Sequence, residues 1–269
     1  MSELAHGEDR VTGAWQQPVN RWQGVAENSI HTDSVARKVG MRGGTIPGTV
    51  HLTHFAPILT GLFGERWLNT GSISMYYTYA TIDREDVRAI VKRPPAGAKD
   101  VQLDAWVENV EGRVVCKGTV AVGKPSALPY VRSLPLENAA PGAVRILAQM
   151  KPGMEIPARD DYEVRGEKDE SGPIRDPQMM YRALQVFPPE VKTAPAVGFF
   201  GATEIVLHNG PIVYGRKYKK TGKVACVGDS PKTEFAWFDS WLHDKDGTLV
   251  AEMRHMTRWM KVSSPLWAA

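Results

Sequence analysis

The sequence predicts an α+β fold: two antiparallel β-sheet units, each built around a central helix, with the helix of the second unit degenerate. Its 269 residues suffice for two domains of ordinary size, and 42% of them are hydrophobic, enough for a sizeable core. A segment with the alternation of a β-hairpin appears twice, whereas an apolar segment with the character of a helix appears once. We therefore expect two similar halves, residues 1–135 and 136–269, of which only the first keeps its full helix.

The hairpin segments recur at a constant spacing. In the first half, Val101–Glu108 alternates between apolar and polar residues, and Val114–Val122 returns after a turn. In the second half, Phe235–Leu242 and Thr248–Met260 repeat this arrangement. Four residues recur 135 positions later, close to half the chain length: Tyr79 as Tyr214, Asp104 as Asp239, Trp106 as Trp241, and Gly112 as Gly247. Such self-similarity is typical of a duplicated unit.

The two halves differ around the helix. The first half has an apolar segment at residues 49–67 that predicts the helix, and then strands at Gly71–Ala80 and Val87–Val91. The equivalent of the helix in the second half contains prolines, which exclude a regular helix interior. We expect Pro157–Asp176 to be a charged surface insertion, and Met179–Phe187 to be a short helix or a strand. The proline-rich region at residues 124–153 is the expected boundary.

Composition and charge exclude several classes of protein. A net charge of +3, with lysines and arginines scattered among acids, argues against a nucleic-acid partner. No apolar stretch approaches the roughly 18 residues of a membrane span, and the N-terminus shows no signal peptide, so we expect no membrane partner and a cytoplasmic protein. The two cysteines, Cys116 and Cys226, are too few for a disulfide framework and fit core positions in a reducing compartment.

A polar loop before the helix holds the candidate catalytic residues Glu27, His31 and Asp33, and the candidate substrate-binding residue Asn28. An imidazole can give or take a proton near neutral pH, and a neighbouring carboxylate can act as its partner. The structural alternatives are that His31 caps a turn, that the carboxylates are solvated, and that Asp33 caps a short helix at Ser34–Val39.

A glycine-rich turn at residues 40–48 joins this loop to the helix. The first backbone N–H groups of a helix have no partners within it and can bind a developing negative charge, so Gly48 and Thr49 are candidate substrate-binding residues. Pro57 is a complication, because it either kinks the helix or marks a later start near Ala56. With the later start, the two amides belong to a turn and the oxyanion interpretation weakens.

Other chemistry has weaker support. His51 and His54 lie one helical turn apart, but a zinc site needs a third ligand and none is apparent, so we expect no metal and no cofactor. The aromatic residues around Trp237 and Trp241 fit sheet packing better than the wall of a ligand tunnel. The sequence contains no nucleophile elbow, phosphate-binding glycine loop, dinucleotide fingerprint or paired-cysteine zinc motif.

The segment from Asn28 to Asp33, followed by Gly48 at the start of a helix, resembles the hydratase motif of the MaoC-like hydratase/dehydratase family, roughly D-x-N-P-[LIV]-H-x-D. The resemblance implies a double hotdog fold and addition of water to, or its removal from, an α,β-unsaturated or 3-hydroxy acyl thioester. It also implies that His31 is the acid/base, that Asn28 matches the family asparagine, and that Gly48 holds the thioester oxygen. The implied partner is a small-molecule substrate on CoA or a carrier protein, with either a monomer or a homodimer open.

The sequence departs from the family pattern at three positions: Ala26 replaces the catalytic aspartate, Ser29 the proline, and Pro47 the histidine before the helix glycine. Glu27 or Asp33 then takes the role of the aspartate, or the chemistry differs. A hotdog thioesterase is one alternative, although the predicted helix has no acid before Glu65. A non-catalytic protein that binds an acyl thioester or another small molecule is the other.

Overall fold

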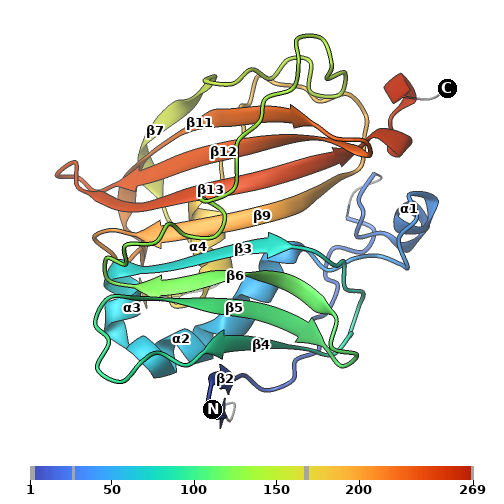
Figure 1. Cartoon of the computed structure of the whole chain (residues 1–269). Coiled ribbons are helices and arrows are strands. Elements are labelled where there is room, and N and C mark those ends of the chain that lie inside the picture. Colours follow the sequence, from blue (N-terminus) through green and yellow to red (C-terminus); the bar gives the residue numbers. More distant parts are fainter. Residues whose placement is uncertain (1–3, 26–27, 167–169, 268–269) are drawn as a thin grey trace.

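The computed structural model describes residues 4–25, 28–166 and 170–267. Eleven strands form one antiparallel sheet, in the order β1-β2-β4-β5-β6-β3-β9-β13-β12-β11-β7 (Figure 1). The first half supplies β1 (Ala5–His6), β2 (Arg10–Thr12), β3 (Gly71–Tyr77), β4 (Val87–Lys92), β5 (Val101–Asn109) and β6 (Val114–Val122). The second half supplies β7 (Glu155–Glu163), β9 (Gly198–Leu207), β11 (Lys217–Asp229), β12 (Thr233–His243) and β13 (Leu249–Met260).

The strand order reads almost the same from both edges, which confirms the predicted architecture of two similar β units. β3 and β9 pair antiparallel at the middle, flanked by β6 on one side and β13 on the other. The predicted hairpins become β5–β6 and β12–β13, and the alternation holds: Leu103, Ala105 and Val107 are buried in the main core. Two short strands, β8 (Gly172–Pro173) and β10 (Val213–Tyr214), pair separately.

The central helices lie on one face of the sheet (Figure 1). A 3₁₀ helix η1 (Gly48–Phe55) runs directly into α2 (Ala56–Phe63), followed by α3 (Glu65–Thr70). Pro57 lies in the first turn of α2, where the missing N–H costs nothing, so the helical run begins at Gly48 and changes type at Ala56. The remaining helical segments are α1 (Asp33–Lys38), α4 (Pro177–Leu184), η2 (Lys261–Ser263) and η3 (Pro265–Trp267).

The second half keeps a central helix, α4, whose eight residues make it shorter than the continuous run of η1 and α2 in the first half. The side chain of Asp176 caps it by accepting the Gln178 N–H at 2.8 Å, and the prolines at 188 and 189 follow its end. The 135-residue spacing therefore holds for the hairpins but not for the helices, because α4 begins 129 positions after η1.

One prediction for the second half is wrong in part, and one strand was missed. Residues 157–163 of the segment expected to be a surface insertion belong to the edge strand β7, whose exposed charged residues hide the alternation of a strand. The central strand β9 was not predicted, because it is buried on both faces and lacks alternation. The boundary at residues 135 and 136 falls within the connection 123–154 between β6 and β7, and it stays a prediction.

No helix in the described part of the chain is both long and apolar enough to cross a bilayer.

Candidate active site

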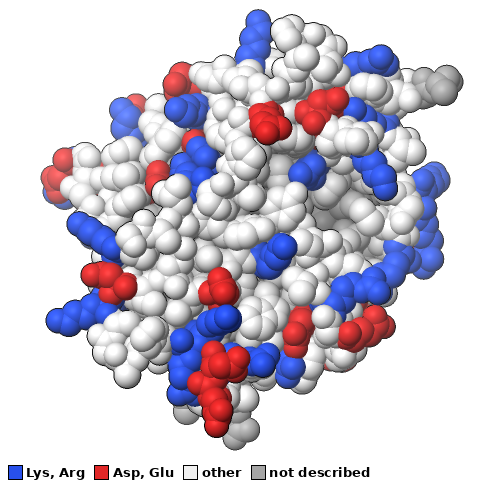
Figure 2. All heavy atoms as spheres, viewed as in Figure 1, with Lys and Arg blue, Asp and Glu red and all other residues white. Residues whose placement is uncertain are grey.

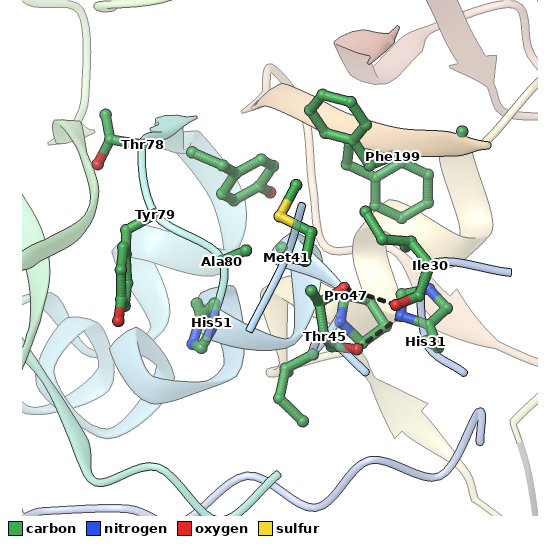
Figure 3. A pocket seen from close by; sticks show the side chains of 15 residues that line it. Ile30, His31, Met41, Thr45, Pro47, His51, Thr78, Tyr79, Ala80 and Phe199 are labelled. Atoms are coloured by element: carbon green, nitrogen blue, oxygen red, sulfur yellow. Dashed lines mark hydrogen bonds between the residues drawn. The ribbon is translucent and has the colours of Figure 1, made fainter. Parts of the chain in front are cut away.

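A cavity of about 360 Å³ opens at the end of β3, where the loop before η1 meets the start of β9. Its lining is mostly apolar and aromatic, with two imidazoles (Figure 3). In the space-filling view, a hollow lies beside this end of the sheet, and lysines and arginines gather at the edge formed by α1 (Figure 2). The lining residues are Ile30, His31, Met41, Thr45, Ile46, Pro47, Gly48, His51, Tyr77, Thr78, Tyr79, Ala80, Gly198, Phe199 and Phe200.

His31 lies half-buried in the wall of this cavity. Its Nδ1 lies 2.7 Å from the carbonyl oxygen of Thr45. A carbonyl can only accept a hydrogen bond, so Nδ1 carries the proton and Nε2 keeps its lone pair. Burial lowers the pKa of His31 below its ordinary value, against the smaller opposing effect of the Thr45 hydrogen bond. The ring is therefore neutral at neutral pH and can accept a proton at Nε2.

Of the other predicted loop residues, Asn28 and Asp33 lie outside the cavity lining. The carboxylate of Asp33 accepts the backbone N–H of Gly44 at 2.6 Å and thereby fixes the turn. Asp33 is the first residue of α1 rather than its cap, because Thr32 occupies the cap position. Asn28 is exposed in a turn, and Glu27 falls outside the described residues. None of the described lining residues is an aspartate or a glutamate.

The start of η1 forms a second part of the cavity wall. Gly48 begins the helix directly after Pro47, and the first hydrogen bond of this turn runs from the Val50 N–H to the Pro47 carbonyl. No hydrogen bond to the Gly48 or Thr49 amide is found within the described residues. A Cβ at position 48 would lie 2.8 Å from the Tyr77 ring, so only glycine fits here. Gly48 thus offers a backbone donor in the cavity lining, whereas Thr49, next to it, is buried and is not among the lining residues.

His51 is a lining residue that the sequence analysis considered only as a metal ligand. Its Nε2 lies 2.9 Å from the Thr81 hydroxyl, and its Nδ1 is buried without a partner among the described residues. Burial, with a smaller effect of nearby His54, holds the pKa of His51 well below its ordinary value. His51 is therefore a second neutral imidazole at this cavity. The only signal in the sequence that could have identified it is its position one helical turn after Gly48.

Tyr77 connects the cavity to the second half of the molecule. Its hydroxyl lies 2.9 Å from Thr203 Oγ1 on β9, which lies 2.9 Å from Nδ1 of His255 on β13. The ring of Phe200, another lining residue, packs edge-on against His255 at 4.7 Å between centroids. Both halves therefore build the cavity, and no local sequence pattern indicates this.

Two arginines stack on Tyr79 at the rim of the cavity. The guanidinium carbons of Arg42 and Arg113 each lie 4.7 Å from the centre of the Tyr79 ring. Arg42 also pairs with Glu85 at 2.5 Å, whereas the exposed Arg113 is 3.9 Å from Glu111. Both guanidinium groups that stack on the Tyr79 ring thus have a carboxylate partner.

The sequence matches no protein-family model and no curated protein. Solved structures match along nearly the whole chain. A putative MaoC domain dehydratase from Chloroflexus aurantiacus J-10-fl gives a TM-score of 0.56 at 10% identity, with 95% of each chain covered. A double hotdog protein of Mycobacterium tuberculosis, Rv0216, gives 0.50 at 10% identity, with 84% of this chain and 85% of that chain covered. The chain has the double hotdog fold.

A double hotdog fold does not distinguish between reactions. The tesB protein MAP1729c of Mycobacterium avium subs paratuberculosis matches this chain with a TM-score of 0.52 at 14% identity, covering 96% of this chain and 95% of its own. A putative oleoyl thioesterase from Lactobacillus plantarum gives 0.50 at 11% identity. The neighbours thus include proteins named as a dehydratase and as a thioesterase, and at these identities they show the fold alone.

Proposed function

We propose that this protein is a hydro-lyase that adds water to an α,β-unsaturated acyl thioester or removes it from the 3-hydroxy form. The observation that carries the proposal is the hydrogen bond between His31 Nδ1 and the Thr45 carbonyl, which leaves Nε2 as a proton acceptor in the wall of a cavity. The MaoC dehydratase among the structural neighbours supports the same reaction class.

In the hydration direction, His31 Nε2 takes a proton from water as the water oxygen bonds to Cβ of the substrate. The electron pair of the C=C bond moves toward the thioester carbonyl, whose oxygen becomes negative. The amides of Gly48 and Thr49 stabilise this charge as donors at the start of η1. The proton on Nε2 then passes to Cα, which restores His31. The reverse sequence removes water.

This mechanism needs no carboxylate, and it gives the predicted residues distinct roles. His31 is the acid/base and Gly48 and Thr49 bind the oxygen. Asp33 keeps the turn at Gly44 in place, so it positions rather than reacts. Glu27 remains a candidate partner for His31 from the sequence alone.

The proposal is tested with 2-enoyl-CoA thioesters of increasing chain length, followed by the ultraviolet absorbance of the conjugated thioester. We expect His31→Asn to lower kcat/KM by roughly 10²–10⁴-fold, the usual contribution of a general acid/base. The matched control is His6→Asn, at an exposed histidine of β1 far along the chain from the cavity. Full activity in His31→Asn with an intact circular dichroism spectrum would refute the assignment.

Hydrolysis of the thioester is the second candidate, because two structural neighbours at comparable TM-scores are named as a tesB protein and a thioesterase. The same His31 nitrogen could direct water at the thioester carbonyl, with the same amides on its oxygen. A thiol reagent in the same assay separates the reactions, since only hydrolysis releases free CoA. Tight binding of the thioester without either product would instead indicate a non-catalytic binding protein.

A further inference from the structure

A second cavity, of about 400 Å³, lies on the face of the sheet opposite the helices. The connection 123–154 crosses this face (Figure 1) and forms its outer wall. Its volume lies within the range of about 300–1,000 Å³ usual for small-molecule sites. The lining is rich in aromatic side chains, among them Tyr76, Tyr130, Phe235 and Trp237.

Small residues of β9 lie between β3 and β13, two of the strands that line this cavity. Ala202 of β9 pairs with Tyr76 on one side and Met256 on the other, and Gly201 precedes it at a bulge. The wall above is fixed by hydrogen bonds from the Val131 and Arg132 amides to buried side chains of the sheet. The outer wall of the cavity is therefore a connection that hydrogen bonds hold against the sheet.

Arg258 lies half-buried in this cavity without an anionic partner. Its guanidinium donates to the Tyr76 hydroxyl at 2.9 Å and to Thr233 Oγ1 at 3.0 Å, both of them neutral. It also lies over the Phe235 ring at 5.0 Å. Among the described residues, no carboxylate lies within ion-pair distance of it. A charge removed from water normally has an opposite charge close by, so this one has capacity for an anion.

Lys117 adds a second cation on the opposite side of the cavity. It pairs across the strands with Tyr76, and it makes no ion pair with any other residue that the structure describes. Glu137 is the one carboxylate in the lining, and it is exposed. The lining thus carries a net charge of +1, surrounded by rings of Tyr76, Tyr130, Phe235 and Trp237 that can stack on a flat ligand.

We propose that this cavity binds a planar aromatic ligand that carries an anionic group. The ring packs among the aromatic side chains, and the anion pairs with Arg258 and Lys117. Arg258 suits this role because its planar guanidinium can bind a phosphate or carboxylate with two hydrogen bonds. The proposal is independent of the reaction at His31.

Calorimetric titration of the full chain with ADP, adenosine and benzoate tests the site. ADP combines a flat base with a phosphate group, adenosine has the base without the charge, and benzoate has a ring with a carboxylate. We expect ADP or benzoate to bind at least tenfold more tightly than adenosine, and the difference to shrink as salt is raised. Absence of binding by both anions, or an affinity for adenosine equal to that for the tighter-binding anion, overturns the proposal.

Variants locate the binding. Arg258→Gln is expected to lower the affinity for the anion at least tenfold, whereas Arg258→Lys keeps part of it. Lys117 is exposed, so Lys117→Gln tests the site even if the Arg258 variants do not fold, and we expect a severalfold loss. The matched control is Lys223→Gln, a cation over the Trp241 ring outside this cavity. An equal loss in the control would show that the binding is non-specific and contradict the proposal.

A competition experiment identifies the source of the anion. Thr78 lines both cavities, so a long ligand in the first could reach the second around the end of β3. If CoA displaces ADP one for one, the natural ligand of this cavity is the nucleotide end of a carrier. If CoA and ADP bind simultaneously, the natural ligand is a separate molecule. His31→Asn is expected to bind ADP like the wild type, so failure of the proposed reaction and failure of this site are distinguishable.

Discussion

At the scale of single residues, one hydrogen bond defines the chemistry of the candidate site. The Thr45 carbonyl fixes the tautomer of His31 and turns its basic nitrogen away from the backbone. Burial has the larger effect on the pKa of His31 and lowers it, so that the ring is uncharged over the range in which cells operate. The ring can then accept a proton from water without first losing one.

This electrostatic environment predicts the pH dependence of turnover. In hydration the reactive form of His31 is the neutral ring, so kcat/KM is expected to fall as the pH decreases through its lowered pKa. The acidic limb should therefore lie below the ordinary histidine value of about 6.5. A pH–rate profile of the wild type with the best enoyl thioester measures this, and an acidic limb above that value would contradict the role of His31.

Buried histidines that do not line the cavity act on stability instead. Burial lowers the pKa of His255 to about 3, and of His54 to about 4. Their unfolded pKa is near 6.5, so the unfolded chain binds more protons below that pH. The stabilisation is present in full above about pH 6.5 and is lost as the pH falls toward the folded values.

We expect His255→Gln to weaken this dependence. Each buried histidine contributes up to about 1.4 kcal/mol of unfolding free energy per pH unit while only the unfolded state is protonated. Urea unfolding at about pH 7, 6 and 5 gives the free energy of unfolding at each pH. A plot of this free energy against pH should therefore be shallower for the variant than for the wild type. Identical slopes would show that His255 is not protonated on unfolding in this range.

At the scale of elements, the contact between the start of η1 and β3 decides whether the cavity forms. Gly48 lies against the face of the Tyr77 ring, and the Tyr77 hydroxyl is held by Thr203 on β9. The ring cannot give way without breaking that hydrogen bond. Two central strands and the first helical turn are thus fixed relative to one another at the point where the thioester oxygen is proposed to bind.

Gly48→Ala should therefore displace the helix start. The new Cβ would lie within 3.0 Å of ring carbons, which real structures do not show, so the two amides must move. A displacement of about 1 Å can lower a rate on the order of a hundredfold, and we expect a loss of that size in kcat/KM. The control is Gly61→Ala in α2, where the nearest atom is the flexible end of Leu4 at 3.1 Å. Similar activities of the two variants would be inconsistent with this packing.

At the scale of the whole molecule, the β3–β9 pair makes one sheet of the two halves. A polar cluster reinforces this junction: the buried carboxylate of Glu204 on β9 accepts from Ser74 on β3 and from Arg132 of the connection. Burial raises the pKa of Glu204 above its ordinary value, although Arg132 opposes this. The central helices of the two halves, η1 and α4, are also joined, because the Thr53 hydroxyl of η1 donates to the Asp176 carboxylate that caps α4.

We expect the chain to unfold in one transition, with tryptophan fluorescence and far-ultraviolet circular dichroism coincident in urea. Glu204→Gln should lower the unfolding free energy by about 2–3 kcal/mol, because it removes the charge from a buried hydrogen-bonded pair. Glu163→Gln, which affects an exposed pair with Arg165, should change it by less than about 1 kcal/mol. Two separated transitions would show that the halves are independent.

The sequence predicted the elements whose periodicity is local. The alternation in Val101–Glu108 and its return at Val114–Val122 specified β5 and β6, because one face of each strand is buried and the other is not. β9 escaped prediction, since a central strand buried on both faces has no alternation. The charged edge strand β7 escaped for the opposite reason, because nearly all of it is exposed.

The sequence by itself determined that the chain contains two similar β units, and that a histidine stands shortly before a glycine at the start of a helix. Only the tertiary structure decided which side chains meet there. It directs Asp33 to Gly44, brings His51 into the cavity wall, and supplies Phe199 and Phe200 from the other half. The physical reason is that these contacts depend on the pairing of β3 with β9, strands more than a hundred residues apart, which leaves no trace in local spacing.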